Sequence, residues 1–319
     1  MSATLIAVVV ALVLGHLAQS LAASVRDYSW YRNWLRWLDA RLSSNEFWRG
    51  RWGMVIALVP PLLAVSLFQL ALLEPLWGLA GLAFSIAVLF YAWGPRDLDL
   101  DVEAIAAAGD PVSRRQAAAR LWPEGEMPAT LDGPSLIEAV FRNAQQRWFG
   151  VLFWFLVLGP LGALLYRLTV LAAQGEASSE LPGETRLGAR KLLALLDWPV
   201  AQLMTLSLAL VGNFDTVLGS WREAGGASFD LDRPFLGAVA RASVKCELAD
   251  EAADYDGYDG SRDNGSVDVG EGGLPAPPAL PPAWSAELPE LRDAMSLVWR
   301  SLLVWLAVLA LFVIAGWVS

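Results

Sequence analysis

The polar side chains with the clearest capacity for chemistry gather on one amphipathic stretch, residues 136 to 147, directly before a long apolar run. A spacing of four residues places Glu138, Arg142 and Gln146 along one stripe of a helix, and Asn143 and Arg147 form the neighbouring stripe. Guanidinium groups beside amides present planar donors that suit a carboxylate or a phosphate. The sequence therefore predicts a site for an anionic small ligand here; a solvated helix face with a Glu138–Arg142 ion pair is the alternative.

Three further ionisable residues lie inside apolar runs: His16, Arg167 and Asp197. Because ionisable groups at membrane depth usually pair with one another or serve function, we single them out and expect them to be mainly structural. The single cysteine and single histidine exclude an intramolecular disulfide, a cysteine cluster for zinc and a two-histidine metal site. The phosphate-loop, GxGxxG, HExxH and GxSxG motifs are also missing. We therefore predict no catalytic residues, no metal and no cofactor.

Composition places the chain in a membrane. Of its 319 residues, 55% are hydrophobic and only 18% are charged, and the mean hydropathy is +0.43. Many of its 16 tryptophans flank long apolar runs, as expected of an aromatic belt. The net charge of −10 arises mainly between residues 249 and 290, and no basic surface is left for nucleic acid. The lipid bilayer is the expected partner, and nucleic acid is not.

The run from Trp148 to Leu171 is the clearest candidate for a transmembrane helix. At about 1.5 Å per residue it is long enough to cross a hydrocarbon core of about 30 Å. Near its middle, Pro160 removes a backbone hydrogen bond and Gly159 lets a neighbouring helix come close. We therefore predict one kinked crossing with a partner helix against it.

Other apolar runs predict further crossings, at residues 2–23, 53–73, 76–93 and 297–318. A run at residues 191–212 is interrupted by Asp197, Pro199 and Gln202, and it is counted as a crossing because it restores the expected orientation of the last run. A cleaved signal peptide is the alternative for the first run, although no basic residue precedes it. The sequence thus predicts five or six transmembrane helices.

Arginines set the expected orientation. Residues 26–51 carry six arginines, and so do residues 94–147, whereas the connection between the second and third runs has no Lys or Arg. By the positive-inside rule the N-terminus is outside. The same rule places the loops 24–52, 94–147 and 213–296 in the cytoplasm.

Helix signals also occur outside the apolar runs. Asp110 before Pro111, and Asp132 before Gly133 and Pro134, are typical of helix starts. Apolar residues at helical spacing predict a helix within residues 26–51: Tyr31, Leu35, Leu38 and Leu42. That helix lies either in the membrane surface or against the protein's own spans.

Residues 249–290 differ in kind from the rest of the chain. They are acidic and rich in Gly and Pro, with too few apolar residues to fold, so we predict a disordered insert. Asp254 and Asp256 invite comparison with a calcium loop, but the other carboxylates of such a loop are missing. We therefore expect a tether and not a metal site.

These observations predict an all-α, polytopic integral membrane protein with cytoplasmic helical loops. Five segments follow from them: N-terminal membrane helices with an amphipathic loop at 1–93, a cytoplasmic helical segment at 94–147, the central span with a second apolar segment and short helices at 148–248, the acidic linker at 249–290, and a C-terminal transmembrane helix at 291–319.

Several short motifs carry a resemblance to a known family: Leu152-Phe153-Trp154, Gly159-Pro160, Ala163 to Arg167, and Leu196-Asp197-Trp198-Pro199. In these the chain resembles the AmpE family of bacterial inner-membrane proteins, which is associated with β-lactamase induction and muropeptide recycling. AmpE is in turn similar to the CobD/CbiB membrane amide synthase, which joins an aminopropanol unit to cobyric acid using ATP.

The resemblance implies a multi-pass protein of the inner membrane that modulates β-lactamase induction, and hence antibiotic resistance, in response to a muropeptide or another anionic ligand. A membrane or cytoplasmic protein partner is implied as well. The alternative is an ATP-dependent amide-forming enzyme. Glu138 and Asn143 match the synthase pattern, whereas Arg142 and Gln146 stand where that pattern has carboxylates. The sequence therefore favours the regulator over the enzyme.

Overall fold

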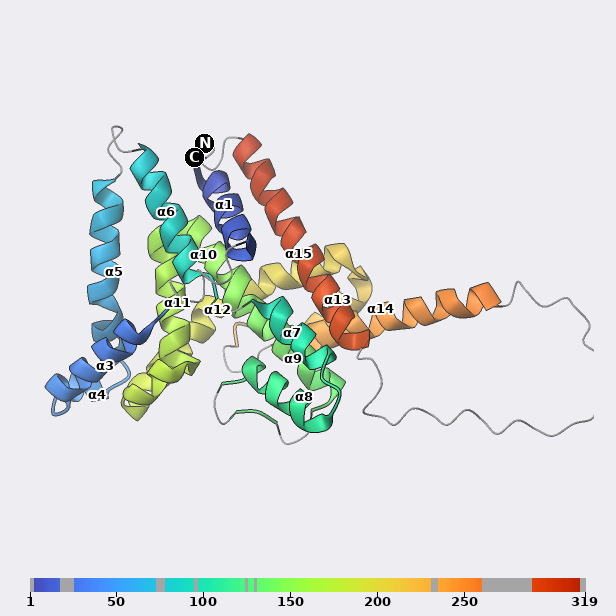
Figure 1. Ribbon diagram of the computed structural model, residues 1–319, viewed down its shortest axis with the longest axis horizontal. Helices are drawn as coiled ribbons and strands as arrows, with labels where there is room; N and C mark the ends of the chain where they lie inside the picture. The colour runs from blue at the N-terminus through green and yellow to red at the C-terminus, as the bar shows by residue number, and fades with distance from the viewer. Residues whose placement is uncertain are drawn as a thin grey trace, which may run out of the picture.

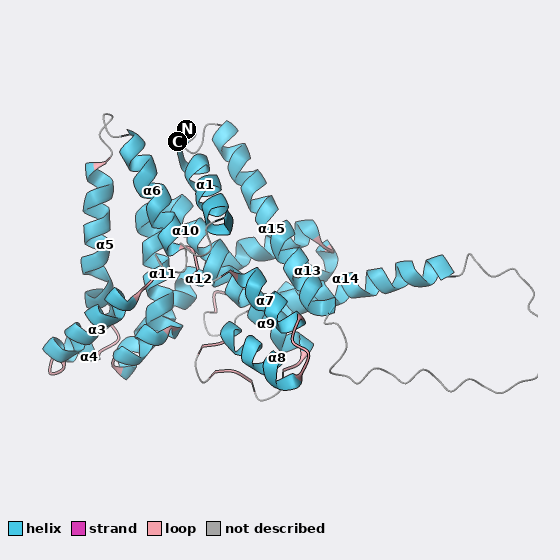
Figure 2. Ribbon diagram, in the orientation of Figure 1, coloured by secondary structure: helices cyan, strands magenta, loops and turns pink. Residues whose placement is uncertain are grey.

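The computed structural model describes residues 3–17, 26–72, 78–94, 97–123, 126–128, 131–230, 235–259 and 289–315. In these ranges every regular element is a helix, as Figure 2 shows, so the all-α prediction is confirmed. The elements are α1 (Ala3–Leu17), α3 (Ser29–Leu42), α4 (Glu46–Arg49), α5 (Gly53–Ala71), α6 (Gly78–Ala92), α7 (Leu98–Ala106), α8 (Pro111–Ala118), η2 (Ala119–Leu121), α9 (Gly133–Ala144), the π-helix η3 (Gln145–Phe149), α10 (Gly150–Leu158), α11 (Pro160–Gln174), η4 (Glu176–Glu180), α12 (Gly183–Val211), α13 (Phe214–Glu223), α14 (Leu236–Asp259) and α15 (Pro289–Ile314).

The molecule has an apolar end and a polar end (Figure 1). Helices α1, α5, α6 and α15 extend to the apolar end, where α1 begins and α15 ends, whereas α3, α4, α7, α8 and α9 form the polar end. Three helices are long and apolar enough to cross a membrane, Gly53–Ala71, Gly183–Val211 and Glu290–Ile314, while Thr4–Leu14 and Gly78–Ala92 are apolar but shorter. The helices support a membrane protein without fixing the predicted number of spans.

The apolar stretch predicted as one kinked crossing is two helices that fold back on each other. The turn is Gly159, whose φ of 68° and ψ of −151° are open to glycine alone at low cost. A Cβ on Gly162 would lie 2.0 Å from the carbonyl oxygen of Trp154, and one on Gly150 would lie 2.1 Å from the Tyr166 ring. One continuous helix would hold Gly150 and Tyr166 about 24 Å apart.

The prediction of a single crossing at Trp148–Leu171 is therefore wrong. Composition and length fit a crossing, but the left-handed glycine before Pro160 reverses the chain, and small residues let the two arms touch. α10 has 9 residues, too few to span about 30 Å of hydrocarbon. The two arms of the α10–α11 hairpin consequently run back along each other.

Neighbouring helices satisfy the polar groups of this hairpin. Gln69 of α5 accepts a hydrogen bond from the Leu161 amide at 3.2 Å and donates one to the Leu158 carbonyl at 3.4 Å. Arg167, which is 2% exposed, donates from Nε to the Ala92 carbonyl at 2.7 Å, at the end of α6. Arg26 donates to the Gly94 carbonyl at 2.7 Å, just beyond the same end. Two arginines thus lie at the negative end of the α6 dipole.

The predicted helix starts at the polar end are confirmed. Asp110 accepts hydrogen bonds from the amides of Val112 and Ser113, and Asp132 accepts one from the amide of Ser135. In α3 the apolar stripe faces the protein, with Tyr31, Leu35 and Leu38 buried. Of the two alternatives for this helix, packing against the spans holds, because Trp34 donates to the Ala57 carbonyl of α5 at 3.1 Å.

The predicted disordered insert begins as a helix. α14 continues to Asp259, since extending an existing helix through alanine and acidic residues needs no new nucleus. The remainder of the insert, residues 260–288, lies outside the described residues, as do the Glu74–Pro75 connection and the side chains of His16, Asp254 and Asp256.

Candidate functional site

A cavity of about 250 Å³ lies at the base of the α10–α11 hairpin. η3 leads into the hairpin, Gln174 ends it, and the middle of α12 closes the cavity. Its polar lining combines guanidiniums, carboxylates, amides and an indole: Arg142, Gln145, Gln146, Gln174, Arg190, Asp197, Trp198 and Asp230. Such a concave site with convergent polar groups is the typical form of a small-molecule site.

Asp197 is the best-positioned acid of the cavity. The Tyr166 hydroxyl donates to its Oδ1 at 2.5 Å, and the Gln146 side chain donates to the same carboxylate. The Gln145 amide donates to the Asp197 backbone carbonyl at 3.0 Å. Charge-assisted bonds of this kind fix the orientation of a carboxylate. The remaining lone pairs of Asp197 are the ones available to a ligand in the cavity.

Two consecutive glutamines of the π-helix, Gln145 and Gln146, both bond to Asp197 of α12. In a regular α-helix neighbouring side chains point about 100° apart, and the wider π-turn, common at functional sites, shifts this register. α15 supports the turn from outside, with Trp299 packed on Trp148 at 5.2 Å and Trp305 packed on Phe149 at 5.1 Å between ring centroids. The position of Gln145 and Gln146 thus depends on aromatic packing from the C-terminal helix.

Two arginines supply the positive charge of the cavity. Arg142 donates to the Leu121 carbonyl at 3.3 Å, and burial lowers its pKa while the carboxylate of Glu126 opposes that shift. Arg190 donates to the Ala173 carbonyl at 3.3 Å and pairs with Glu126 at 3.0 Å. Arginine stays protonated in proteins, so the partly buried Arg142 guanidinium favours an anionic ligand, whereas Arg190 is exposed.

The five residues predicted as one site separate in the structure. Arg142 and Gln146 line the cavity. Glu138 instead forms an ion pair with Arg241 of α14. Asn143 donates to the Leu121 and Ala139 carbonyls at 2.8 and 2.7 Å. The Glu138 pair thus links α9 to α14, and the Asn143–Leu121 bond links α9 to η2.

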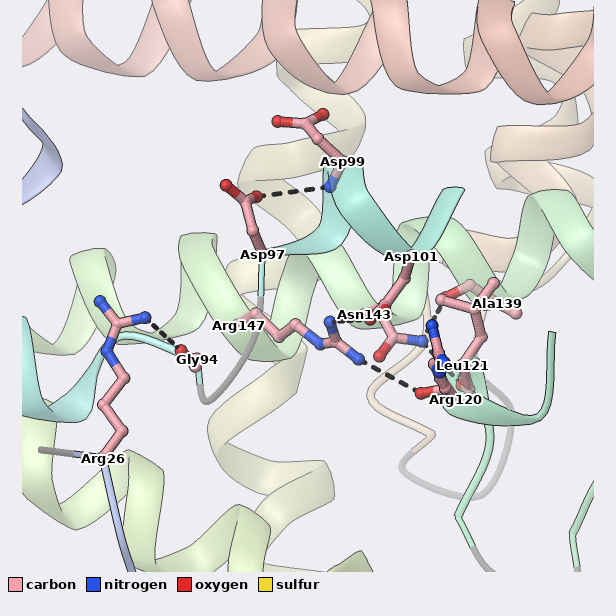
Figure 3. Close-up of polar contacts among 10 residues, drawn as sticks. All are labelled: Arg26, Gly94, Asp97, Asp99, Asp101, Arg120, Leu121, Ala139, Asn143 and Arg147. Atoms are coloured by element: carbon pink, nitrogen blue, oxygen red, sulfur yellow. Dashed lines mark hydrogen bonds and ion pairs between the residues drawn. The ribbon is translucent and has the colours of Figure 1, made fainter. Parts of the chain in front are cut away.

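Arg147 is not among the residues that line the cavity. Figure 3 shows its guanidinium pointing toward Asp101 and Arg120. Its Nη1 forms an ion pair with fully buried Asp101 of α7 at 2.8 Å, and its Nη2 donates to the Arg120 carbonyl at 3.3 Å. The assumption of an unbroken α-helical stripe fails here because the π-turn begins at Gln145.

Sequence reasoning missed most of the cavity. Asp197 was expected to be mainly structural, and it is one of the residues that line the cavity. The ionisable group inside an apolar run was the available signal for it. Gln174, Arg190 and Asp230 come from other segments, and only the fold brings them together. Among the side chains that the structure describes, no group of three or more His, Cys, Asp or Glu is placed to hold a metal ion.

Comparison with known proteins gives two curated relatives. The chain is 30% identical over 263 residues to the "Cobalamin biosynthesis protein CobD" of Stutzerimonas stutzeri, an alignment that covers 77% of each chain. It is 31% identical over 183 residues to the protein of the same name from Chromobacterium violaceum, covering 54% of this chain and 56% of that protein. No family model matches the chain, and no solved structure does.

These relatives overturn the prediction of a β-lactamase regulator. Both are named for cobalamin biosynthesis, so the comparisons support the CobD/CbiB part of the predicted resemblance and do not confirm the AmpE part. The muropeptide ligand depended on that function alone, and nothing in the cavity lining favours it over other anionic molecules. By the extent and identity of the first alignment, the chain belongs to the CobD family of cobalamin biosynthesis proteins.

Proposed function

We propose that this protein forms an amide bond in cobalamin biosynthesis, joining an aminopropanol unit to a carboxyl group of cobyric acid. The observation that carries the proposal is the cavity, where an oriented carboxylate, Asp197, shares one lining with two guanidiniums, Arg142 and Arg190. An amide-forming site needs both kinds of group, because one substrate is an amine and the other is a carboxylic acid. Membership of the CobD family suggests the reaction, and the lining of the cavity suggests which residues take part in it.

We assign the carboxylate and the guanidiniums of the lining to different substrates. Asp197, held by Tyr166 and Gln146, binds the ammonium group and accepts a proton from it, since only the neutral amine attacks a carbonyl carbon. Arg142 and Arg190 bind the carboxyl group or a phosphate. When bound, ATP supplies the leaving group that makes the acyl carbon reactive, and these arginines are the groups suited to its phosphates.

The cavity is large enough for only part of the two substrates. At about 250 Å³ it lies below the range of about 300–1,000 Å³ usual for drug-sized ligands. It fits the aminopropanol unit and the reacting carboxyl arm. The corrin ring of cobyric acid remains outside the cavity mouth, so only one arm of the large substrate enters.

We place the protein in the bacterial inner membrane as a multi-pass protein, with the arginine-rich segments 24–52 and 94–147 in the cytoplasm. On this orientation the cavity opens on the cytoplasmic side, because its walls join helices of the polar end. ATP and cobyric acid are then available to it directly.

The test is synthesis by the purified protein in lipid nanodiscs. Cobyric acid, ATP and aminopropanol or its phosphate are supplied, and the amide product is measured by mass spectrometry. Asp197→Asn should lower the rate at least about 100-fold, as expected for loss of a positioned proton acceptor. The matched control is Asp215→Asn, an exposed acid on α13, which should leave the rate unchanged. Absence of product from the unaltered protein, together with failure to restore growth of a strain lacking the synthase, contradicts the proposal.

A further inference from the structure

α12 has the composition of a membrane-spanning helix but a different placement. It is long and apolar enough to cross, yet it carries Arg190, Asp197 and Gln202 along its length. We infer that α12 does not cross the membrane. It lies along the membrane surface at the polar end of the molecule, with one apolar face in the acyl chains of the adjacent leaflet.

The first turn of α12 is fixed at the polar end. Thr185 donates to the carbonyl oxygens of Trp48 and Gly50, and Glu184 pairs with Arg51 at 3.3 Å. These partners directly precede α5, where that helix enters the membrane. α12 therefore starts at the level of the headgroups.

The chain turns back directly after α12. α13 follows at once and packs back, with the Trp221 indole donating to Gln202 at 2.9 Å. α13 also contacts α14, where Thr216 lies 3.8 Å from Cys246.

α14 in turn is joined to α9 at the polar end. Arg241 of α14 forms an ion pair with Glu138 of α9. A crossing helix would separate its two ends by about 30 Å of hydrocarbon. Both ends of α12 instead belong to one body, on one side of the membrane.

The contact with α15 indicates how deep the C-terminal half of α12 lies in the membrane. Ser207 accepts a hydrogen bond from the Trp305 indole at 2.8 Å, and Trp299, held by Asp99 at 2.9 Å, marks the polar boundary of α15. Trp305 lies about 9 Å beyond Trp299 along the helix, whereas Thr185 and Ser207 are about 33 Å apart along α12. α12 is therefore inclined to the membrane plane and not perpendicular to it, and Figure 1 shows it running obliquely beneath α6 to the middle of α15.

The two faces of α12 have different neighbours. Exposed leucines recur on one face, at 45%, 39%, 52% and 63% exposure: Leu195, Leu203, Leu206 and Leu210. At about 100° per residue, the cavity residues Leu193, Asp197 and Ala201 lie on the opposite face. The leucine face continues the exposed apolar surfaces of α5 and α15, against which α12 packs. Acyl chains are the partner that covers such a surface without exposing leucine to water.

This placement also settles the number of crossings. With α12 in the surface and the α10–α11 hairpin re-entrant, the crossing helices are α1, α5, α6 and α15. Four crossings return the chain to the side on which it began, and α1 does begin at the end of the molecule where α15 finishes (Figure 1). A fifth crossing by α12 would put those two ends on opposite sides.

The first test compares three single-cysteine variants of the full chain, made on Cys246→Ser and labelled with a membrane-impermeant maleimide in sealed vesicles of each orientation. Asn213→Cys lies just beyond α12, Val112→Cys is an exposed site on α8, and Ala315→Cys is just beyond α15. Asn213→Cys should label from the same side as Val112→Cys and from the side opposite to Ala315→Cys. Labelling of Asn213→Cys from the side of Ala315→Cys overturns the inference.

The second test examines the lipid contact itself. A fluorophore attached at Leu206→Cys should be quenched by nitroxide groups on acyl chains as strongly as one at Leu63→Cys, an exposed position on α5, and one at Val112→Cys should not be quenched. Lack of quenching at Leu206→Cys contradicts the lipid contact. Disulfide cross-linking of two copies through Leu206→Cys would assign the face to a dimer instead, and would equally overturn the proposal.

Discussion

α5 and the α10–α11 hairpin are both apolar segments that contain proline, and they respond to it in opposite ways. α5 holds Pro60 and Pro61 and stays helical from Gly53 to Ala71, whereas the hairpin reverses at Gly159 before Pro160. A residue before proline is pushed out of the α region. Gly159 moves to a φ of 68°, where a β-branched residue such as Val59 would be strained. Of these two segments, only the one with glycine before its proline reverses.

Both regions also need a side chain from elsewhere to satisfy backbone groups. In α5 the amide missing at Pro61 leaves the Ala57 carbonyl without its helical donor, and Trp34 of α3 donates to it at 3.1 Å. In the hairpin, Gln69 of α5 bonds both sides of the turn. In each region, backbone groups near proline are thus bonded by a side chain from another helix. At membrane depth such backbone groups cannot form hydrogen bonds to water instead.

The largest expected effect is that of Gly162→Ala in the hairpin. A Cβ there would lie 2.0 Å from the Trp154 carbonyl oxygen, so the two arms must separate. We expect a loss of about 3 kcal/mol in the free energy of unfolding, the upper end for overpacking. Thermal unfolding in detergent measures it, with Gly78→Ala as control because a Cβ at Gly78 meets nothing within 4 Å. Equal stability of the two variants would contradict the hairpin geometry.

Gly159→Ala tests the turn directly. Its φ of 68° and ψ of −151° should cost an alanine about 2 kcal/mol of backbone strain. The comparison in α5 is Val59→Ala, also directly before a proline but 47% exposed, which should change stability by at most about 0.5 kcal/mol. If a straight helix ran through this region, Gly159→Ala would stabilise the protein more than Val59→Ala, since alanine is a better helix former than glycine.

Sequence patterns predicted the elements better than their connections. The caps at Asp110 and Asp132 and the buried stripe of α3 depend on neighbours within four residues, and they are confirmed. The reversal at Gly159 depends on one backbone conformation and on contact between residues far apart in the chain, such as Gly150 and Tyr166. Hydropathy reports the composition of a segment and carries no information on that contact.

The candidate site shows the same limit. Arg142 and Gln146 were accessible to helical spacing, because Arg142 lies in α9 and Gln146 is only the second residue of the π-turn that follows it. Arg190 and Asp230 carry no local signal, and they reach the cavity only after α12 has packed across the hairpin base. Asp197 was visible as an ionisable residue in an apolar run, but its role depends on Tyr166 and Gln146.

Gln69→Leu should have an intermediate effect. The leucine keeps the apolar volume but leaves the Leu161 amide and the Leu158 carbonyl without their partner, at a cost of about 1–2 kcal/mol. Leu70→Ala, on an exposed neighbour in the same turn of α5, is the matched control for general damage to the helix. If both variants unfold at the same temperature, Gln69 does not hold the turn.

The smallest effect distinguishes the docking role of proline in α5. Trp34→Phe removes the donor to the Ala57 carbonyl and should cost about 1 kcal/mol. Pro61→Ala should restore a helical amide to that carbonyl, so the two changes together should cost less than their sum. A double-mutant cycle measured by thermal unfolding gives the coupling, expected at about 0.5–1 kcal/mol. Simple additivity would mean that the Ala57 carbonyl needs no donor from α3. The prolines of α5 would then create no need for a partner side chain. In that case α5 and the hairpin, whose turn is bonded by Gln69, would share only an apolar, proline-containing sequence.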